Sequence, residues 1–195
     1  MGIIDRISEF LNPGSHASLE VKNAAVINRV LVGEALVIED MDLKNVAHID
    51  LIIGPRGSAA ERAFTRTLTT QRKGVNGLLA VVAPNLMTKP ATVMFNKVTI
   101  RNGVQAVQMF GPAQRGVSMA VMDCVADGTI PQNEVDDIFI CVGVFIDHKA
   151  DDDSKIQNWN YRATKQAIKS AIAGGPKVAD ILSNYKTAIH PFQAE

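Results

Sequence analysis

The chain has 195 residues and a mass of 21.0 kDa, the size of one ordinary domain. Hydrophobic residues make up 47% of it and charged residues 21%, so it can bury a full core, and global disorder is excluded. Its 20 lysines and arginines balance 20 aspartates and glutamates, which excludes bulk attraction to nucleic acid or to an anionic membrane as its main function. Any anionic ligand must therefore be held by local groups.

The cysteines and the hydropathy pattern predict a cytoplasmic protein. Cys124 and Cys141 lack the spacing of metal ligands, which argues against a zinc module or a disulfide scaffold and favours a reducing compartment. The sequence has no apolar run of the roughly 18 residues that a membrane span needs. Met1–Arg6 also lacks the apolar run of a signal peptide.

Residues 1–23 are predicted to form an extension of the main domain. Their apolar residues have helical spacing: Ile3, Ile4, Ile7, Phe10 and Leu11. A short amphipathic helix needs a surface for its apolar side, so we expect it to pack on its own domain or on a neighbouring subunit. Recruitment of another partner, or of a membrane, is the alternative. Its polar side lacks the positive charge that membrane surfaces favour.

The main domain, residues 24–195, alternates between strand and helix patterns. Strands are predicted at 24–38, 46–53, 78–83, 92–100 and 137–146. Helices are predicted after a Ser58 cap and at 104–127, 154–173 and 178–182, with a break or sharp kink at Gly111-Pro112. Early hairpins and late helices favour a two-layer α+β domain over a doubly wound sheet.

The strand at 46–53 carries the first candidate site residues. Alternation directs Ile49, Leu51 and Ile53 to the core, and His48 and Asp50 to the opposite face. Side chains two apart on one face are ~6.5–7 Å apart, so both can contact one ligand. A histidine with the ordinary pKa of ~6.5 can transfer a proton near neutral pH, and a carboxylate can accept hydrogen bonds from an amine or amide. A merely solvated or hydrogen-bonded strand histidine is the alternative.

Two further positions suit a polar ligand. Lys97 and Thr99 share one face of the strand at 92–100, beyond Phe95, and can supply two donors to a heterocycle or carboxylate. Gln114 falls in the first turn after Pro112, where helix N–H groups are expected to be free. The alternatives are a lysine extended into solvent from a strand end, and a solvated glutamine.

No metal site is predicted. Asp151, Asp152 and Asp153 lack the spacing of a calcium loop and better serve as the acidic start of the helix at 154–173. The histidines at 16, 148 and 190 have no metal-like partners in sequence, and both cysteines stand in apolar surroundings typical of a core.

Several blocks resemble the formaldehyde-activating enzyme family, from about Leu31 to Phe192, in the family's order and with matching spacing. They are Gly33-Glu34-Ala35-Leu36, Ala47-His48-Ile49-Asp50-Leu51, Leu79-Ala80-Val81, Ala83-Pro84-Asn85-Leu86, Phe95-Asn96-Lys97-Val98-Thr99, Gln105-Ala106-Val107, Phe110-Gly111-Pro112-Ala113-Gln114 and His190-Pro191-Phe192.

The resemblance implies a fold like the second domain of ribosomal protein S5 and a homopentamer with pterin sites in clefts between subunits. The implied activity is that of a hydro-lyase of one-carbon metabolism and formaldehyde detoxification. It condenses formaldehyde with tetrahydromethanopterin, the co-substrate, to methylene-tetrahydromethanopterin and water, and it needs no metal. His48 matches the family's proton donor; Asp50, Leu79, Lys97, Thr99 and Gln114 match its substrate-binding positions. A non-catalytic pterin- or formaldehyde-binding protein, acting as sensor or carrier, is the alternative.

Overall fold

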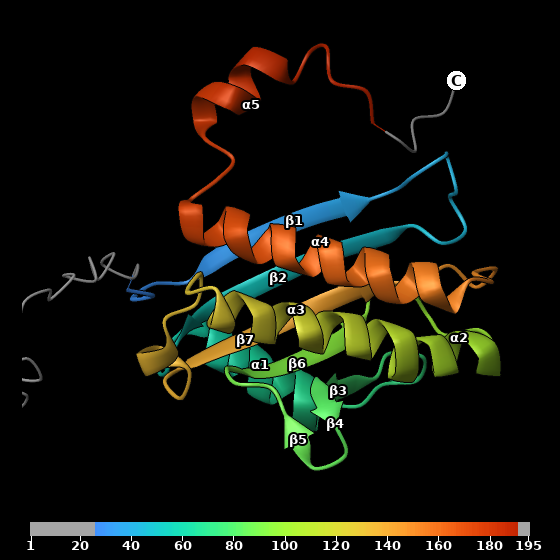
Figure 1. The fold of residues 1–195 in the computed structure, drawn as a ribbon, viewed down its shortest axis with the longest axis horizontal. Helices are drawn as coiled ribbons and strands as arrows, with labels where there is room; N and C mark the ends of the chain where they lie inside the picture. Colours follow the sequence, from blue (N-terminus) through green and yellow to red (C-terminus); the bar gives the residue numbers. More distant parts are fainter. Residues whose placement is uncertain (1–25, 191–195) are drawn as a thin grey trace, which may run out of the picture.

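The computed structural model of the chain describes residues 26–190, so the helix predicted within residues 1–23 lies outside the described residues. The main sheet has five strands in the order β1-β2-β7-β6-β3 (Figure 1). The strand bounds are β1 Leu31–Val37, β2 Ala47–Pro55, β3 Gly77–Leu79, β6 Ala91–Asn96 and β7 Ile138–Phe145. β6 and β7 are parallel, and the other neighbouring pairs are antiparallel. A small separate hairpin joins β4 (Val81–Ala83) and β5 (Leu86–Met87).

The helices are α1 (Ala59–Thr69), α2 (Gly103–Gln108), α3 (Gln114–Ala126), α4 (Asp153–Ala173) and α5 (Val178–Asn184). α2 runs into α3 through one π-helical turn, Met109–Ala113, and a 3₁₀ turn, Gln132–Glu134, precedes β7. None of the helices in the described part of the chain is long and apolar enough to cross a membrane.

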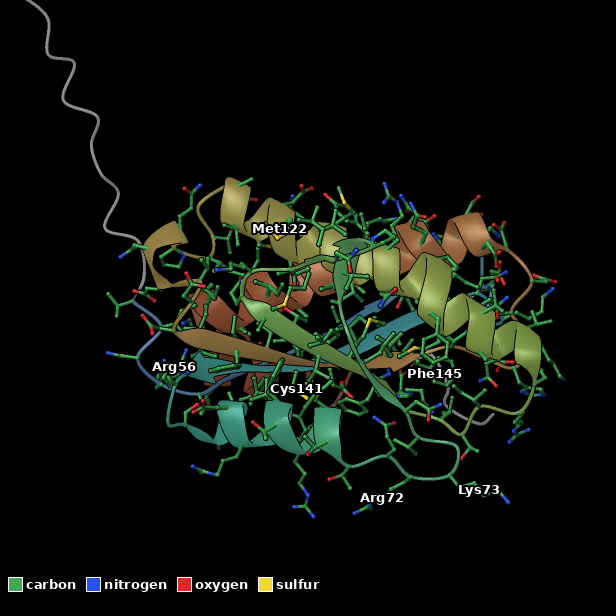
Figure 2. The ribbon with its side chains drawn as sticks, turned by 90° about the horizontal axis from the view of Figure 1, so that it is seen from below. Arg56, Arg72, Lys73, Met122, Cys141 and Phe145 are labelled. Carbon is green, nitrogen blue, oxygen red and sulfur yellow. The ribbon has the colours of Figure 1, made fainter. Side chains whose placement is uncertain are left out.

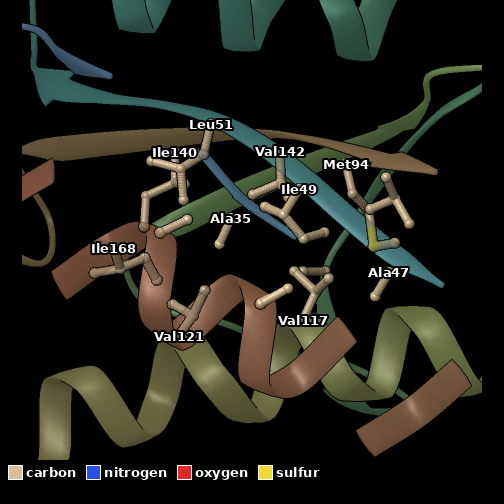
Figure 3. Packing of buried hydrophobic residues seen from close by; sticks show 14 of the residues in the cluster. Ala35, Ala47, Ile49, Leu51, Met94, Val117, Val121, Ile140, Val142 and Ile168 are labelled. Carbon is tan, nitrogen blue, oxygen red and sulfur yellow. The ribbon is translucent and has the colours of Figure 1, made fainter. Parts of the chain in front are cut away.

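The core lies between one face of the sheet and the helices α3 and α4. Ile49 and Leu51 of β2 and Val142 of β7 are buried on this face, as the alternation predicts (Figure 3). Val121 of α3 and Ile168 of α4 close the core from the helix layer. Full burial of one such side chain is worth ~1.5–3 kcal/mol, so this face fixes which residues of β2 point the other way.

α1 covers only one end of the opposite face. Its Phe64 ring packs on Phe139 of β7 at 5.1 Å, and its Thr67 hydroxyl lies 3.5 Å from the Cys141 sulfur. With 11 residues α1 is ~16 Å long, whereas the 8 residues of β7 span ~27 Å. α1 lies on the side of the sheet away from α3 and α4, and Phe145 lies beyond its end (Figure 2). The predicted α+β class is confirmed, but α1 adds a third layer over part of the sheet; among residues 26–190 no other helix covers the rest of that face, which we call its open half.

Several predicted boundaries are wrong for local reasons. The first strand begins at Leu31, and the strand predicted at 78–83 is two short strands, because β4 leaves the main sheet to pair with β5. β6 ends at Asn96, whose side-chain amide donates to the carbonyls of Gly74 and Val98 and so draws the chain into a loop.

At Gly111-Pro112, where the sequence predicts a break or sharp kink, the structure has a π-helical turn between α2 and α3. The π turn accommodates the proline without ending the helix, so α2, the turn and α3 are continuous. The N–H of Gln114 donates to the Gly111 carbonyl, so the free N–H expected at Gln114 does not exist.

The turn between β1 and β2, which leads directly into the His48 strand, is tied to the start of α4. Buried Asn45 donates to Asp42 and Asp151 at 3.0 Å each and accepts from the N–H groups of Asp151 and Asp152 at 3.1 Å each. The Lys155 ammonium lies 2.6 Å from Asp42, and this bond, with those from Asn45, holds the pKa of the Asp42 carboxyl well below its usual range.

The Asn45 contacts give a stability prediction. Asn45→Ala leaves two N–H groups at the start of α4 without their side-chain acceptor, so we expect a loss of about 2–3 kcal/mol in the free energy of unfolding. Urea denaturation measures it. The control is Asn158→Ala at an exposed position of the same helix, expected within about 0.5 kcal/mol of the parent chain. Equal values for the two variants would contradict the role given to Asn45.

Candidate active site

Four charged or ionisable side chains meet on the open half of the sheet. Glu34 of β1 lies opposite Asp50 of β2 in the strand register, and His48 lies two residues before Asp50. The Lys97 ammonium, just after β6, lies 2.5 Å from an Asp50 carboxylate oxygen and 3.2 Å from His48 Nδ1. His48 Nε2 lies 3.0 Å from Glu34 Oε1. We call Glu34, His48, Asp50 and Lys97 the ionic cluster.

Lys97 reaches this cluster by crossing β7. Its strand and β2 are separated by β7, so the two backbones are ~10 Å apart. The residue in between is Gly143, which lies opposite both Asp50 and Phe95 in the register. A Cβ atom there would come within 2.9 Å of Phe95 Cζ and 3.1 Å of Lys97 Cγ. Glycine at position 143 therefore leaves the space through which the lysine passes.

The partners of His48 select one form of its ring. An ammonium group only donates, so Nδ1, facing Lys97, must accept. The ring proton is then on Nε2, which lies 3.0 Å from Glu34 Oε1; Asp50 Oδ1 is 3.6 Å from Nε2, beyond hydrogen-bond range. This is the neutral Nε2–H tautomer. The side chain is 31% exposed, so a ligand can reach the imidazole.

The predicted face of β2 is confirmed: His48 and Asp50 point away from the buried Ile49 and Leu51. Lys97 joins them even though β6 ends one residue earlier, because the Lys97 N–H still donates to the Val144 carbonyl at 2.8 Å. This bond continues the strand ladder and keeps the side chain on the predicted face.

Thr99 lies beside the cluster rather than in it. With Lys97 and Phe145 it lines a depression of about 470 Å³. Phe145 lies opposite His48 in the β2–β7 register, so this depression adjoins the imidazole.

Leu79 and Gln114 lie elsewhere in the same chain. The Gln114 side-chain amide donates to the Leu79 carbonyl at 2.7 Å, so these two residues meet at the β3 edge of the sheet. β6 and β7 separate that edge from β2, which puts the two groups ~14 Å apart. The structure therefore brings together His48, Asp50 and Lys97, with Thr99 nearby, and places Leu79 and Gln114 as a separate pair.

Sequence reasoning missed Glu34 and Gly143. Gly33 and Ala35, on either side of Glu34, are buried, so strand alternation alone directs the Glu34 side chain away from the core. Its place opposite Asp50 depends on the strand register, and that of Gly143 depends on pairing between distant segments.

Possible metal ligands and the two thiols are the other groups that could carry the chemistry. Within residues 26–190 no three His, Cys, Asp or Glu side chains are grouped to hold a metal ion. Both cysteines are buried, as predicted, and burial raises the pKa of Cys124 to about 12 and also raises the pKa of Cys141. Among the described residues the imidazole of the ionic cluster is thus the group best placed to move a proton.

The comparisons with known proteins agree with each other. The family model for the formaldehyde-activating enzyme (Fae) matches residues 32–193. The chain is 49% identical over 178 residues to the 5,6,7,8-tetrahydromethanopterin hydro-lyase of Methanosarcina barkeri, an overlap of 88% of this chain and 98% of that protein. It is 43% and 44% identical to the bifunctional enzymes Fae/Hps of Methanosarcina mazei and Archaeoglobus fulgidus, covering 82% and 83% of this chain and 40% of each longer protein. The chain therefore belongs to the formaldehyde-activating enzyme family.

Proposed function

We propose that this chain is a hydro-lyase that condenses formaldehyde with tetrahydromethanopterin to methylene-tetrahydromethanopterin and water. The observation that carries the proposal is the ionic cluster, in which a partly exposed imidazole with its proton on Nε2 stands between a carboxylate and an ammonium. The near full-length relative from Methanosarcina barkeri, named for this hydro-lyase activity, supports the choice of substrates.

His48 acts as the proton donor. A pterin nitrogen attacks formaldehyde and gives a carbinolamine, whose hydroxyl leaves as water only when it is protonated. His48 Nε2–H supplies that proton, a contribution typically worth ~10²–10⁴ in rate. Because Lys97 lies at Nδ1, it can return a proton to the ring as Nε2 loses its own. Ring closure by the second pterin nitrogen releases one proton; Nε2 takes it up while Nδ1 returns its proton to Lys97, so both residues are restored.

The neighbouring residues orient the reactants. Glu34 holds the imidazole through Nε2, and Asp50 holds the lysine and can accept a hydrogen bond from a pterin N–H. Thr99 supplies a hydroxyl on the depression next to Lys97. Holding formaldehyde and pterin together supplies part of the rate besides the proton transfer.

Leu79 and Gln114 contact the same pterin from a neighbouring subunit in this proposal. Gln114 belongs to α3, on the side of the sheet away from α1 and the ionic cluster, which supports a site shared between copies. The assembly is a homopentamer with pterin sites at subunit clefts, and the molar mass in solution tests it: a monomer would contradict it.

We also propose a domain organisation, a metal-free reaction and a cytoplasmic location for the protein. The body, residues 24–195, has a fold like the second domain of ribosomal protein S5, and residues 1–23 are an extension of it. The reaction needs no metal, so activity survives a chelator. The protein works in the cytoplasm, where its two free, buried cysteines stay reduced.

Removing the imidazole tests the catalytic role. We expect His48→Gln to lower the enzyme-dependent kcat about 10²–10⁴-fold, because the glutamine amide cannot donate a proton as an acid. Stopped-flow kinetics with tetrahydromethanopterin measure it against a no-protein control, and tetrahydrofolate tests the choice of pterin. If the parent chain binds the pterin but the condensation is no faster than without protein, the proposed enzyme activity is contradicted and a pterin-binding role is favoured.

The space at Gly143 gives a second prediction. Gly143→Ala places a methyl group against Phe95 and Lys97, so the ammonium moves from His48 and Asp50. We expect about a 10²-fold loss in kcat/KM with an unchanged far-UV circular dichroism spectrum. The matched control is Gly103→Ala, where a Cβ meets nothing within 4 Å. Equal activity of the two variants would show that the lysine position is not needed.

A further inference from the structure

A second hollow opens on the same side of the sheet, at the end of α1. It has a volume of about 340 Å³ and is lined by Arg66 and Thr67 from α1, Thr70 and Arg72 from the following turn, and Phe95 from β6 (Figure 2 labels Arg72). We call it the arginine cavity. None of the residues proposed to carry out the condensation lines it.

The arginine cavity has an uncompensated positive charge. In the described residues neither Arg66 nor Arg72 forms an ion pair, whereas Arg56 and Arg162 each pair with a carboxylate. No acidic side chain of the described residues lines the cavity. Guanidinium groups are donors only and match the oxygens of phosphates and carboxylates. The chain has no net charge, so the positive charge of these two arginines is a local excess, and it favours an anionic ligand group.

The turn that carries Arg72 is fixed before any ligand binds. The Gln71 side chain bonds both the N–H and the carbonyl of Gly77, at 3.3 and 3.2 Å. The Asn96 side chain accepts from the Asn76 N–H at 2.8 Å and donates to the Gly74 carbonyl at 2.6 Å. A preformed site loses less entropy when it binds a ligand.

Phe95 connects the arginine cavity to the ionic cluster. Its ring lines the cavity, and its Cζ atom lies at Gly143, where Lys97 crosses toward His48. From β6, which carries Phe95, to β2, which carries His48, the distance is ~10 Å. A ligand that binds at the cluster and extends along the sheet past β6 therefore comes to the cavity that Phe95 lines.

We propose that the arginine cavity binds an anionic group, phosphate or carboxylate, at the end of the pterin side chain remote from the reacting nitrogens. The inference rests on the proposed function. It assigns the co-substrate a second point of attachment that leaves the chemistry untouched, so its loss raises KM without lowering kcat.

Kinetics of arginine variants test the inference. We expect Arg66→Ala and Arg72→Ala each to raise the KM for tetrahydromethanopterin about tenfold and to leave kcat within about twofold. The KM for a tetrahydropterin without the anionic end should not change. The control is Arg62→Ala on the same helix, because the Arg62 guanidinium donates to the Gly57 carbonyl and does not line the cavity. An unchanged KM in the Arg66/Arg72 double variant would overturn the inference.

Two small anions identify the group and separate the inference from the proposed function. Inorganic phosphate that competes with the pterin in the parent chain but not in the double variant indicates a phosphate; the same result with glutamate indicates a carboxylate. Competition by neither overturns the inference. Binding of either anion, followed by NMR without pterin and lost in the double variant, supports the cavity as an anion site even where condensation itself is absent.

Discussion

The contact on which the site depends is the crossing of Lys97 over Gly143. The lysine leaves β6, passes over β7 where no side chain stands, and ends between Asp50 and His48 on β2. This single path fixes the ring form of the histidine, because an ammonium at Nδ1 leaves the proton on Nε2. With a larger residue at 143 a Cβ atom would stand 3.1 Å from Lys97 Cγ, on the path of the lysine.

The open half of the sheet is the second requirement. α1 ends near Cys141, so no helix in the described part of the chain lies over the outer face of β2 and β7 beyond that point. The buried face is fully packed by α3 and α4, which makes the strand register rigid and holds the outward side chains at fixed spacing (Figure 3). A rigid support under an exposed charged cluster is what proton transfer to a bound ligand requires. The end of α1 also forms one wall of the arginine cavity, so one short helix borders both features.

The sequence predicts the part of this site that depends on strand alternation, because that pattern is local. The direction of His48 and Asp50 followed from the apolar residues beside them, and that of Lys97 from the same rule applied to β6, two strands away. The parts that depend on pairing between distant segments were out of reach: the register that sets Glu34 opposite Asp50, and Gly143 beneath Lys97. Leu79 came from family resemblance alone, and the carbonyl partner of Gln114 depends on a π turn that periodicity does not reveal.

The central claim is that Lys97 sets the proton on His48. Nitrogen-15 NMR of the imidazole tests it most directly, because protonated and unprotonated ring nitrogens have well-separated shifts. The account predicts the Nε2–H tautomer in the parent chain near pH 7.5, and a loss of that preference in Lys97→Met, with Lys149→Met as an exposed control. A His48 ring protonated on Nδ1, or a tautomer that is the same in the parent chain and in Lys97→Met, would contradict it.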